Sequence, residues 1–336
     1  MSDSPRLGGF KILNDVMWVS LIGPAGDDTF VTRLCRVLSA TEINLPFLTV
    51  GGLGSAPGVH FVVEMHDVPQ VKDALDHNFE ACESRMGMAS VFSLFPHKSD
   101  PMVLGTLLDV LGGHAIKPLA LANSHSAISV VLDEASVDEA VAAMFGPFNV
   151  SSYRTAADWR LAQKGKEALF KEVIASYREE RPKVYGLGLH ETEELLDVRF
   201  ESRQLSQMGH AFKAFGKAGQ MLTFLISLPT QDTSFHFLFS LPAGHESDGT
   251  IQSMTRQGMS VKTFPVTLFT MNGPHFGDRY GIAADILDAL DRARVGLFGL
   301  GCSVASILGV FQSGHADRAV AAIKGCCDVP SIMVNR

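Results

Sequence analysis

The sequence predicts an α+β protein built from four repeats of a strand–helix–strand–strand–helix unit. Four apolar, strand-like segments, each followed by a loop and a helical pattern, begin at Met17, Ser90, Leu195 and Val266. Their spacings are 73, 105 and 71 residues, and the middle interval falls to 72 when the 33-residue polar segment 151–183 is set aside. The same order of elements recurs after each start, and such a period is the signature of repeated structural units.

The first unit shows the order most clearly. A strand at Met17–Gly23 precedes a helix, and runs at Leu45–Val50 and His60–Met65 predict two further strands. Spacings of three and four residues place apolar side chains on one face of each helix. In the first helix these are Val31, Leu34, Cys35 and Leu38, and in the second they are Val68, Val71, Leu75 and Phe79.

The other units follow the same order with different clarity. In the second, a helix starts near Pro101 and strands follow at Ile116–Ala122 and Ala127–Leu132. The third has two clear strands, but its second helix, near Ser247–Thr255, is polar. The fourth has two amphipathic helices and a closing strand at Pro330–Val334.

Residues 151–183 interrupt the repeat. Their apolar residues at helical spacing predict an amphipathic connecting helix that ends at Pro182 and docks on its own sheet, with partner binding as the alternative. The expected division of the chain is unit one at 13–87, unit two at 88–150, the linker helix at 151–183, unit three at 184–263 and unit four at 264–336.

Each unit is expected to form an antiparallel sheet with its helices on one face, which is the ferredoxin-like βαββαβ arrangement. A four-stranded sheet on its own leaves its edges open, and pairing units side by side satisfies those edges. Four units therefore predict two such pairs.

Composition and charge exclude several classes of protein. The net charge of −8 argues against nucleic-acid binding, which needs a basic surplus. The longest apolar runs, such as Leu222–Leu228, are far shorter than the ~20 residues that span a bilayer, and the N-terminus carries no apolar signal core. These features predict a cytoplasmic protein that binds neither nucleic acid nor membrane.

The cysteines and the motifs predict no catalysis. Five scattered cysteines do not suggest a disulfide framework; Cys326 and Cys327 are adjacent, and we favour buried thiols over a redox-active pair. The Gly51–Gly54 loop lacks the ending of a phosphate loop and precedes a strand. No HExxH, nucleophile elbow or His/Cys ligand cluster is present, so we expect no enzyme, no metal and no cofactor.

The turns between first strand and first helix are better candidates for a ligand site. In the fourth unit this turn is Asn272–Ile282, where glycines allow close approach and the N–H groups at the helix start suit a carboxylate. Asp278 is expected to accept from a ligand ammonium. The matching turn in unit two, Pro96–Met102, carries Asp100. A plain helix cap is the alternative for both acids.

At these positions the sequence resembles the ACT domain family, and in particular the regulatory half of aspartate kinases. In unit two, Ser126–Val130 takes the place of the Ser-rich turn and following strand of those proteins. In unit four, Gly281–Ala283 matches a GIA start and Gly301–Ser303 matches a small-residue turn. The four-unit layout without a kinase domain is also similar to eukaryotic cytosolic arginine sensors, which hold their ligand between the second and fourth units.

Two departures bear on the ligand. Lysine-sensing kinases have an acid on the strand after the first helix, where this chain has Lys117–Leu119. They also have a Glu after the turn serine, where this chain has Ala127. A basic amino acid therefore loses two expected partners.

The resemblance implies a non-catalytic regulatory protein that senses a small ligand, an amino acid, between ACT units two and four. It would report binding through a homodimer or a regulated partner protein. The alternative is an ACT-like oligomerisation or partner-binding scaffold without a ligand. The expected ligand-binding residues are Asp100, Pro101, Met102, Val103, His275, Phe276, Gly277, Asp278, Arg279, Gly281, Ile282, Gly301, Cys302 and Ser303.

Overall fold

The structure is a computed structural model, and it describes residues 4–52, 56–151, 155, 157–158, 181–244, 248–274, 276 and 279–335. The residues that define the predicted linker helix, from Trp159 to Tyr177, lie outside this set. In the described residues the fold is a mixed α/β arrangement with one large, mainly antiparallel sheet and eight α-helices.

The order strand–helix–strand–strand–helix occurs twice in the N-terminal half, which we call repeats one and two. Repeat one consists of β2 (Gly9–Ile22), α1 (Phe30–Ala40), β3 (Phe47–Gly51), β4 (Gly58–Glu64) and α2 (Val68–Asn78). Repeat two consists of β5 (Glu83–Phe95), α3 (Pro101–Gly113), β6 (Ala120–Asn123), β7 (Ile128–Asp133) and α4 (Val137–Met144). Two short strands, β1 (Arg6–Leu7) and β8 (Asn149–Val150), pair in parallel beside them.

The same order occurs twice more in the C-terminal half, as repeats three and four. Repeat three consists of β9 (Gly186–Glu201), α7 (Leu205–Lys217), β10 (Phe224–Leu228), β11 (Ser234–Pro242) and α8 (Asp248–Arg256). Repeat four consists of β12 (Ser260–Asn272), α9 (Ile282–Arg292), β13 (Leu297–Ser303), β14 (Ser306–Gln312) and α10 (Ala316–Cys326). The last strand, β15 (Ile332–Asn335), runs parallel to β9.

The first strand of each repeat is long because it serves two repeats. The C-terminal part of β2 pairs with β4, and its N-terminal part pairs with the half of β5 that also pairs with β7. β9 and β12 share their lengths in the same way between repeats three and four. The expected boundaries at 87/88 and 263/264 therefore fall inside β5 and β12, and neighbouring repeats are joined by strand pairing.

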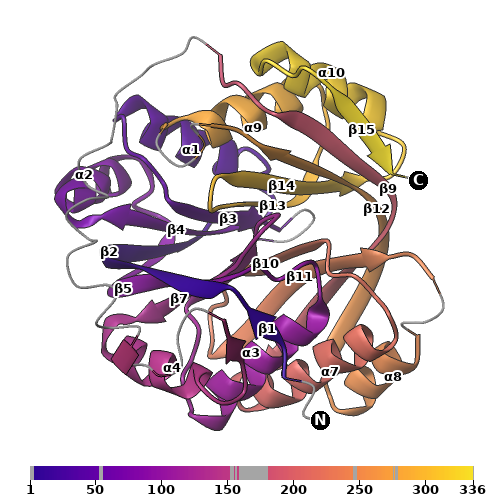
Figure 1. Ribbon diagram of the computed structural model, residues 1–336. Coiled ribbons are helices and arrows are strands. Elements are labelled where there is room, and N and C mark those ends of the chain that lie inside the picture. The colour runs from indigo at the N-terminus through magenta and orange to yellow at the C-terminus, as the bar shows by residue number, and fades with distance from the viewer. Residues whose placement is uncertain are drawn as a thin grey trace.

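The sheet closes on itself. Neighbouring strands follow the order β11-β10-β6-β7-β5-β2-β4-β3-β13-β14-β12-β9, and β9 pairs again with β11. Helices α1, α2, α9 and α10 lie on one outer side of this closed sheet, and α3, α4, α7 and α8 lie on the opposite side (Figure 1). Closure removes most of the exposed edges that an open sheet would present to other chains.

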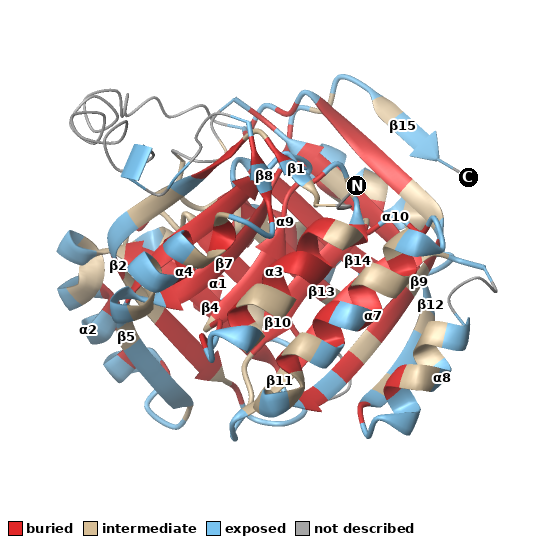
Figure 2. Ribbon diagram, turned by 60° about the horizontal axis from the view of Figure 1, so that its bottom comes forward, coloured by how far each residue is buried: buried red, intermediate tan, exposed pale blue. Residues whose placement is uncertain are grey.

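Three apolar clusters fill the resulting layers. One lies under α1, α2, α9 and α10 and contains Phe30, Leu34, Ile286 and Leu290. A second lies under the opposite four helices and contains Leu107, Leu108, Phe212 and Phe215. The third fills the space inside the sheet, with Phe47, Phe224, Ile226 and Val310. Buried residues line the strands and the inward faces of α3 and α7, whereas β15 and much of α8 are exposed (Figure 2).

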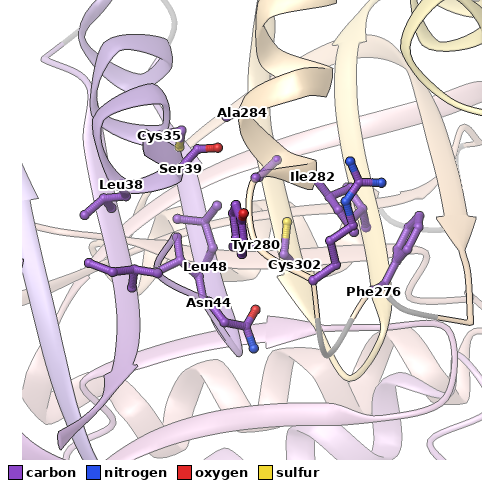
Figure 3. Close-up of a pocket in the computed structure, with 16 residues that line it drawn as sticks. Cys35, Leu38, Ser39, Asn44, Leu48, Phe276, Tyr280, Ile282, Ala284 and Cys302 are labelled. Carbon is purple, nitrogen blue, oxygen red and sulfur yellow. The ribbon is translucent and has the colours of Figure 1, made fainter. Parts of the chain in front are cut away.

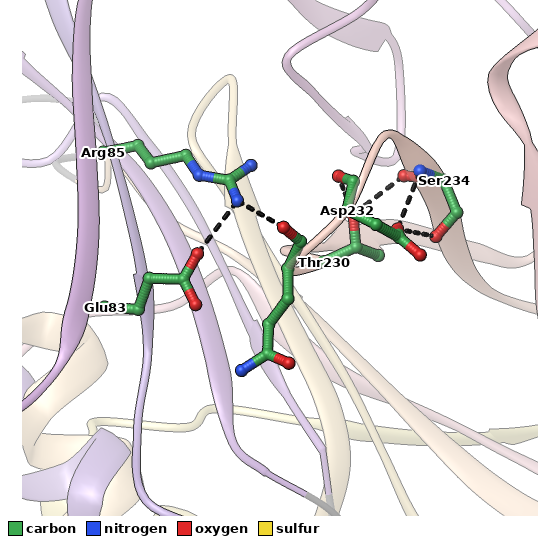
Figure 4. Close-up of polar contacts among 6 residues, drawn as sticks. Glu83, Arg85, Thr230, Asp232 and Ser234 are labelled. Atoms are coloured by element: carbon green, nitrogen blue, oxygen red, sulfur yellow. Dashed lines mark hydrogen bonds and ion pairs between the residues drawn. The ribbon is translucent and has the colours of Figure 1, made fainter.

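The hairpin between β10 and β11 contacts β5 through its turn. The Arg85 guanidinium on β5 donates to the carbonyl oxygen of Gln231 at 2.6 Å and to Glu83 Oε1 at 2.9 Å (Figure 4). Asp232 Oδ1 accepts from the backbone N–H of Ser234 at 2.8 Å and so shapes the turn. The bond from Arg85 to Gln231 therefore ties repeat two to repeat three.

No helix in the described part of the chain has the length and apolar character needed to cross a membrane.

Candidate functional site

Repeats one and four meet along a complete strand ladder. β3 pairs with β13 over five residues, from Phe47 opposite Ser303 to Gly51 opposite Gly299. Above this ladder, α1 and α9 lie side by side on the outer face (Figure 1). Each helix buries an apolar stripe, made by Phe30, Leu34, Cys35 and Leu38 in α1 and by Ile282, Ile286, Leu287 and Leu290 in α9.

A hollow opens between these helices, where the C-terminus of α1 faces the N-terminus of α9 (Figure 3). Its cavity volume, counted by the centres of water-sized spheres, is about 40 Å³, and the 460 Å³ of empty space around these centres includes open solvent at its mouth. Leu38, Leu48, Ile282 and Ile307 form apolar walls, and Ser39 and Asn44 add polar groups. The remaining lining residues are Cys35, Ile43, Leu45, Phe276, Arg279, Tyr280, Gly281, Ala283, Ala284 and Cys302.

Arg279 is the charged group of the hollow. Its side chain is 14% exposed, and its Nη1 atom is buried without a hydrogen-bond partner among the described residues. The nearest described carboxylate belongs to Asp285, whose Oδ2 lies 3.8 Å from Nη2, beyond hydrogen-bond distance. A buried donor of a charged group without a partner is costly, and a planar guanidinium is suited to a carboxylate.

The start of α9 adds backbone donors to the same space. Gly281 precedes the helix with φ of 84°, a left-handed conformation that favours glycine. A Cβ atom at Gly281 would lie 2.6 Å from Ser39 Oγ, so this glycine also permits close approach of α1. The hollow is also lined by the first turn of α9, at Ile282, Ala283 and Ala284. The N–H groups of a first helical turn lack partners within the helix, and the helix dipole favours an anion beside them.

Two thiols face the hollow from opposite walls, Cys35 on α1 and Cys302 on β13 (Figure 3). Burial raises the pKa of the Cys35 thiol to about 12 and raises that of Cys302 as well. Both groups therefore stay protonated at neutral pH and behave as small apolar walls.

The opposite end of the same helix pair is closed by polar contacts. The Thr32 hydroxyl at the start of α1 donates to Asp291 Oδ2 near the end of α9. In the middle, Arg36 forms an ion pair with Asp288, with Nη2 2.5 Å from Oδ1. The helix pair is thus bridged along most of its length and open only where α9 begins.

Repeats two and three meet in a different way, through their helices. A Cβ atom on Gly105 would lie 2.6 Å from the carbonyl oxygen of Gly209, and one on Gly209 would lie 2.7 Å from that of Gly105. Gly112 and Gly216 meet the opposite helix in the same manner. The glycines thus bring the backbones of α3 and α7 together at both ends of the helix pair.

The structure separates the two turns that the sequence suggested would share one ligand. Asp100 accepts a hydrogen bond from Met102 N at 2.8 Å, which confirms its interpretation as a helix cap. Pro101, Met102 and Val103 begin α3, and a Cβ on Gly216 of α7 would lie 2.7 Å from Met102 Cγ. This turn lies with repeat three on one side of the sheet, whereas α9 lies with repeat one on the other (Figure 1). The helix that faces the start of α9 is thus α1 of repeat one and not α3 of repeat two, and a ligand shared by units two and four stays a prediction.

Of the residues expected from the fourth unit, Phe276, Arg279, Gly281, Ile282 and Cys302 line the hollow together. Two others face the inner layer or are enclosed there: a Cβ on Gly301 would lie 2.8 Å from Ile226 Cγ2, and Ser303 is 4% exposed. His275, Gly277 and Asp278 lie outside the described residues.

Sequence reasoning missed the residues that repeat one contributes, from Cys35 to Leu48. The four repeats have nearly equal spacing, so the spacing does not indicate which repeats pair. The turn at Gly281 was identified because glycine and helix-start chemistry are local, and its partner across the interface was not.

Comparisons with known proteins establish the fold. No protein-family model matches the chain, and no curated protein matches it. The structure of aspartate kinase from Synechocystis superposes with a TM-score of 0.78 at 14% identity, covering 98% of this chain and 58% of that chain. The chain thus spans 58% of the length of that kinase and shares the fold of that part. The ligand-free regulatory subunit of aspartate kinase from Thermus thermophilus matches 42% of this chain at 18% identity and a TM-score of 0.38.

Proposed function

We propose that the protein is a non-catalytic regulatory protein that senses a small amino acid in the hollow between α1 and α9. The unpartnered, buried Nη1 of Arg279 carries this proposal. A ligand carboxylate would accept from the guanidinium, and the N–H groups at the start of α9 would favour the same negative charge. The charge-assisted bonds would replace the hydration that Arg279 loses on burial.

The rest of the hollow supports a ligand with a short aliphatic side chain. Leu38, Leu48 and Ile307 offer apolar contact. Among the described lining residues the only charged side chain is a cation, so the hollow favours a neutral or acidic amino acid over a basic one. Asp278, expected to accept from the ligand ammonium, stays a prediction.

The regulatory part of the proposal is supported by the fold shared with aspartate kinase from Synechocystis. The non-catalytic part rests on the sequence, which lacks a phosphate loop, a nucleophile elbow and clustered metal ligands. We further propose that the protein acts in the cytoplasm and reports ligand binding through a homodimer or a partner protein.

A thermal-shift screen against the twenty proteinogenic amino acids tests the proposal. Because a ligand that binds only the folded state stabilises it, a neutral or acidic amino acid should raise the melting temperature, and the rise should grow with the logarithm of its concentration above the Kd. Calorimetric titration of Arg279→Gln should then show binding weakened by about 2–3 kcal/mol, roughly 30- to 150-fold. Arg33→Gln is the control, since Arg33 lies on α1 and pairs with Asp27 away from the hollow. Equal affinity in Arg279→Gln and wild type would refute the site.

A ligand-free scaffold is the second candidate, and the interface between α3 and α7 favours it. The glycine contacts there leave no ligand space at the equivalent helix starts. This candidate predicts that no amino acid raises the melting temperature of the full chain.

A further inference from the structure

Two neighbouring cysteines end helix α10 with their sulfur atoms close together. Cys326 is the last helical residue, and Cys327 follows in an extended conformation with φ of −122° and ψ of 154°. This change of backbone conformation brings both side chains to the same side of the chain, with the two Sγ atoms 3.7 Å apart. The Cys326 thiol also lies 3.4 Å from the carbonyl oxygen of Ile323, to which it donates.

This separation fits two sulfurs bound to one atom. Two sulfurs bound to one atom at about 2.3 Å lie about 3.3 to 3.8 Å apart when the angle at that atom is between that of a pyramidal and that of a tetrahedral centre. A disulfide has its sulfurs about 2.05 Å apart, so at 3.7 Å this pair is reduced. We propose that Cys326 and Cys327 form a two-sulfur site that captures a single thiophilic atom, namely trivalent arsenic or a soft metal ion such as Cu(I).

The surroundings of the pair support capture from the solvent side. Cys326 is partly exposed, and Cys327 lies behind it at 1% exposure. The Arg181 guanidinium donates to the Cys327 carbonyl oxygen at 3.0 Å; the charge of Asp285 raises the pKa of both thiols, and the charge of Arg181 opposes it. The hydrogen bond from Cys327 lowers the pKa of the Cys326 thiol, whereas the same contact and burial raise that of Cys327.

The site provides two sulfur ligands, and this number limits the kinds of atom that it can bind. Among the described residues no group of three or more His, Cys, Asp or Glu side chains is arranged to hold a metal ion. Thiolates prefer soft ions, and at this separation of the sulfurs a bound Cu(I) ion is bent and takes a third ligand from solvent. With an arylarsonous acid, two arsenic–sulfur bonds form, two arsenic–oxygen bonds break and two waters leave with the thiol protons, without change of oxidation state. With Cu(I), the two thiols release protons to solvent.

The test uses the reduced, full-length protein under anaerobic conditions with phenylarsonous acid as probe. Native mass spectrometry should show one arsenical per chain, removed by excess of a small dithiol. Cys326→Ser and Cys327→Ser should each lose the adduct, and Cys302→Ser, which alters a buried thiol on another element, should keep it. A melting curve of each variant verifies that it is folded.

A second arm titrates Cu(I) in competition with a chromophoric chelator. Capture of the arsenical alone assigns the site to covalent thiophiles, and stoichiometric Cu(I) binding that is lost in Cys326→Ser extends it to soft metal ions. Absence of both, or an arsenical adduct that persists in Cys326→Ser, would overturn the proposal.

Discussion

The two interfaces that join the halves of this protein are held together by opposite means. Between repeats one and four, β3 and β13 form a five-residue ladder, and the helices above it are bridged by side chains such as Arg36 and Asp288. Between repeats two and three, the register of β6 and β10 contains a single residue pair, and the helices α3 and α7 touch through their backbones. Where the strands make the contact, a hollow lies between the helices, and where the helices make it, glycines bring their backbones together.

Side chains replace the missing ladder between β6 and β10. The backbone N–H of Leu225 donates to Asn123 Oδ1 at 2.7 Å, and that of Leu121 donates to Ser227 Oγ at 2.8 Å. Buried backbone donors need such partners, because an unpaired one costs as much as a lost hydrogen bond. The fold therefore has one interface that can admit a ligand and one built for close packing.

The largest expected effect is on the closely packed interface. A Cβ atom on Gly209 would lie 2.7 Å from the carbonyl oxygen of Gly105 and 2.8 Å from the N–H nitrogen of Asp109, so Gly209→Val must separate two backbones. We expect a loss of about 3 kcal/mol in the free energy of unfolding, the upper part of the range for overpacking. Urea denaturation measures it. Gly113→Ala, with no atom within 4 Å of the added carbon, is the control and should not destabilise. Equal stability of Gly209→Val and wild type would contradict the close-packing account.

The second expected effect concerns a buried carboxyl in the C-terminal half of the sheet, where the N-terminal half has an apolar residue. Glu193 directly follows the irregularity where β9 pairs with β12, and Val16 follows the matching irregularity in β2. Both side chains are buried, at 4% and 0% exposure. Burial raises the pKa of Glu193 to about 7, and the Thr223 hydroxyl, 2.6 Å from Oε2, opposes this rise.

Because the folded-state pKa of Glu193 lies above the ordinary 4.5, the folded state keeps a proton that the unfolded state releases. The free energy of unfolding should fall between about pH 4.5 and 7 and stay level above that interval. Glutamine does not titrate, so Glu193→Gln should not show this fall. We expect its free energy of unfolding to exceed that of wild type by on the order of 2–3 kcal/mol at pH 8. Denaturation curves at pH 5 and 8 measure the difference, and an identical pH dependence in both proteins would rule out Glu193 as its source.

The smallest effect concerns the polar closure of the interface between α1 and α9. Thr32 is 5% exposed and donates to Asp291, an exposed residue whose carboxyl pKa is raised by partial desolvation and lowered by this hydrogen bond. Thr32→Val should cost about 1 kcal/mol, since it removes one hydrogen bond between the helices while water replaces the donor at the carboxylate. Thermal unfolding measures the loss, and Thr32→Ser, which keeps the hydroxyl, should be close to wild type. Parity between the Val and Ser variants would show that the hydroxyl does not hold the helices.

The sequence allowed the local elements to be predicted, because their causes are local. The stripe of Leu34, Cys35 and Leu38 reports a helix face, and Asp100 before Pro101 reports a helix start; both are present. The shared use of β5 by two repeats could not be predicted in this way, since a strand that pairs on different sides along its length still looks like one apolar run.

The sequence also did not indicate which repeat each repeat pairs with. Nothing in Phe47–Gly51 indicates that β3 will pair with β13 instead of β6, because ladder bonds are made by the backbone and carry no side-chain label. Arg279 and Gly281 were found from the turn chemistry of one repeat, and Ser39 of the facing helix became visible only in three dimensions.

Hydrogen exchange with and without ligand tests the contrast between the two interfaces most directly. The measurement compares backbone exchange in the presence and absence of the amino acid that gives the largest thermal shift. The account predicts slower exchange at the start of α9, over Ile282–Asp285, and at the end of α1, with no change at the start of α3. Protection at Pro101–Leu104 without protection at α9 would contradict it, because the ligand would then occupy the interface that the glycines close.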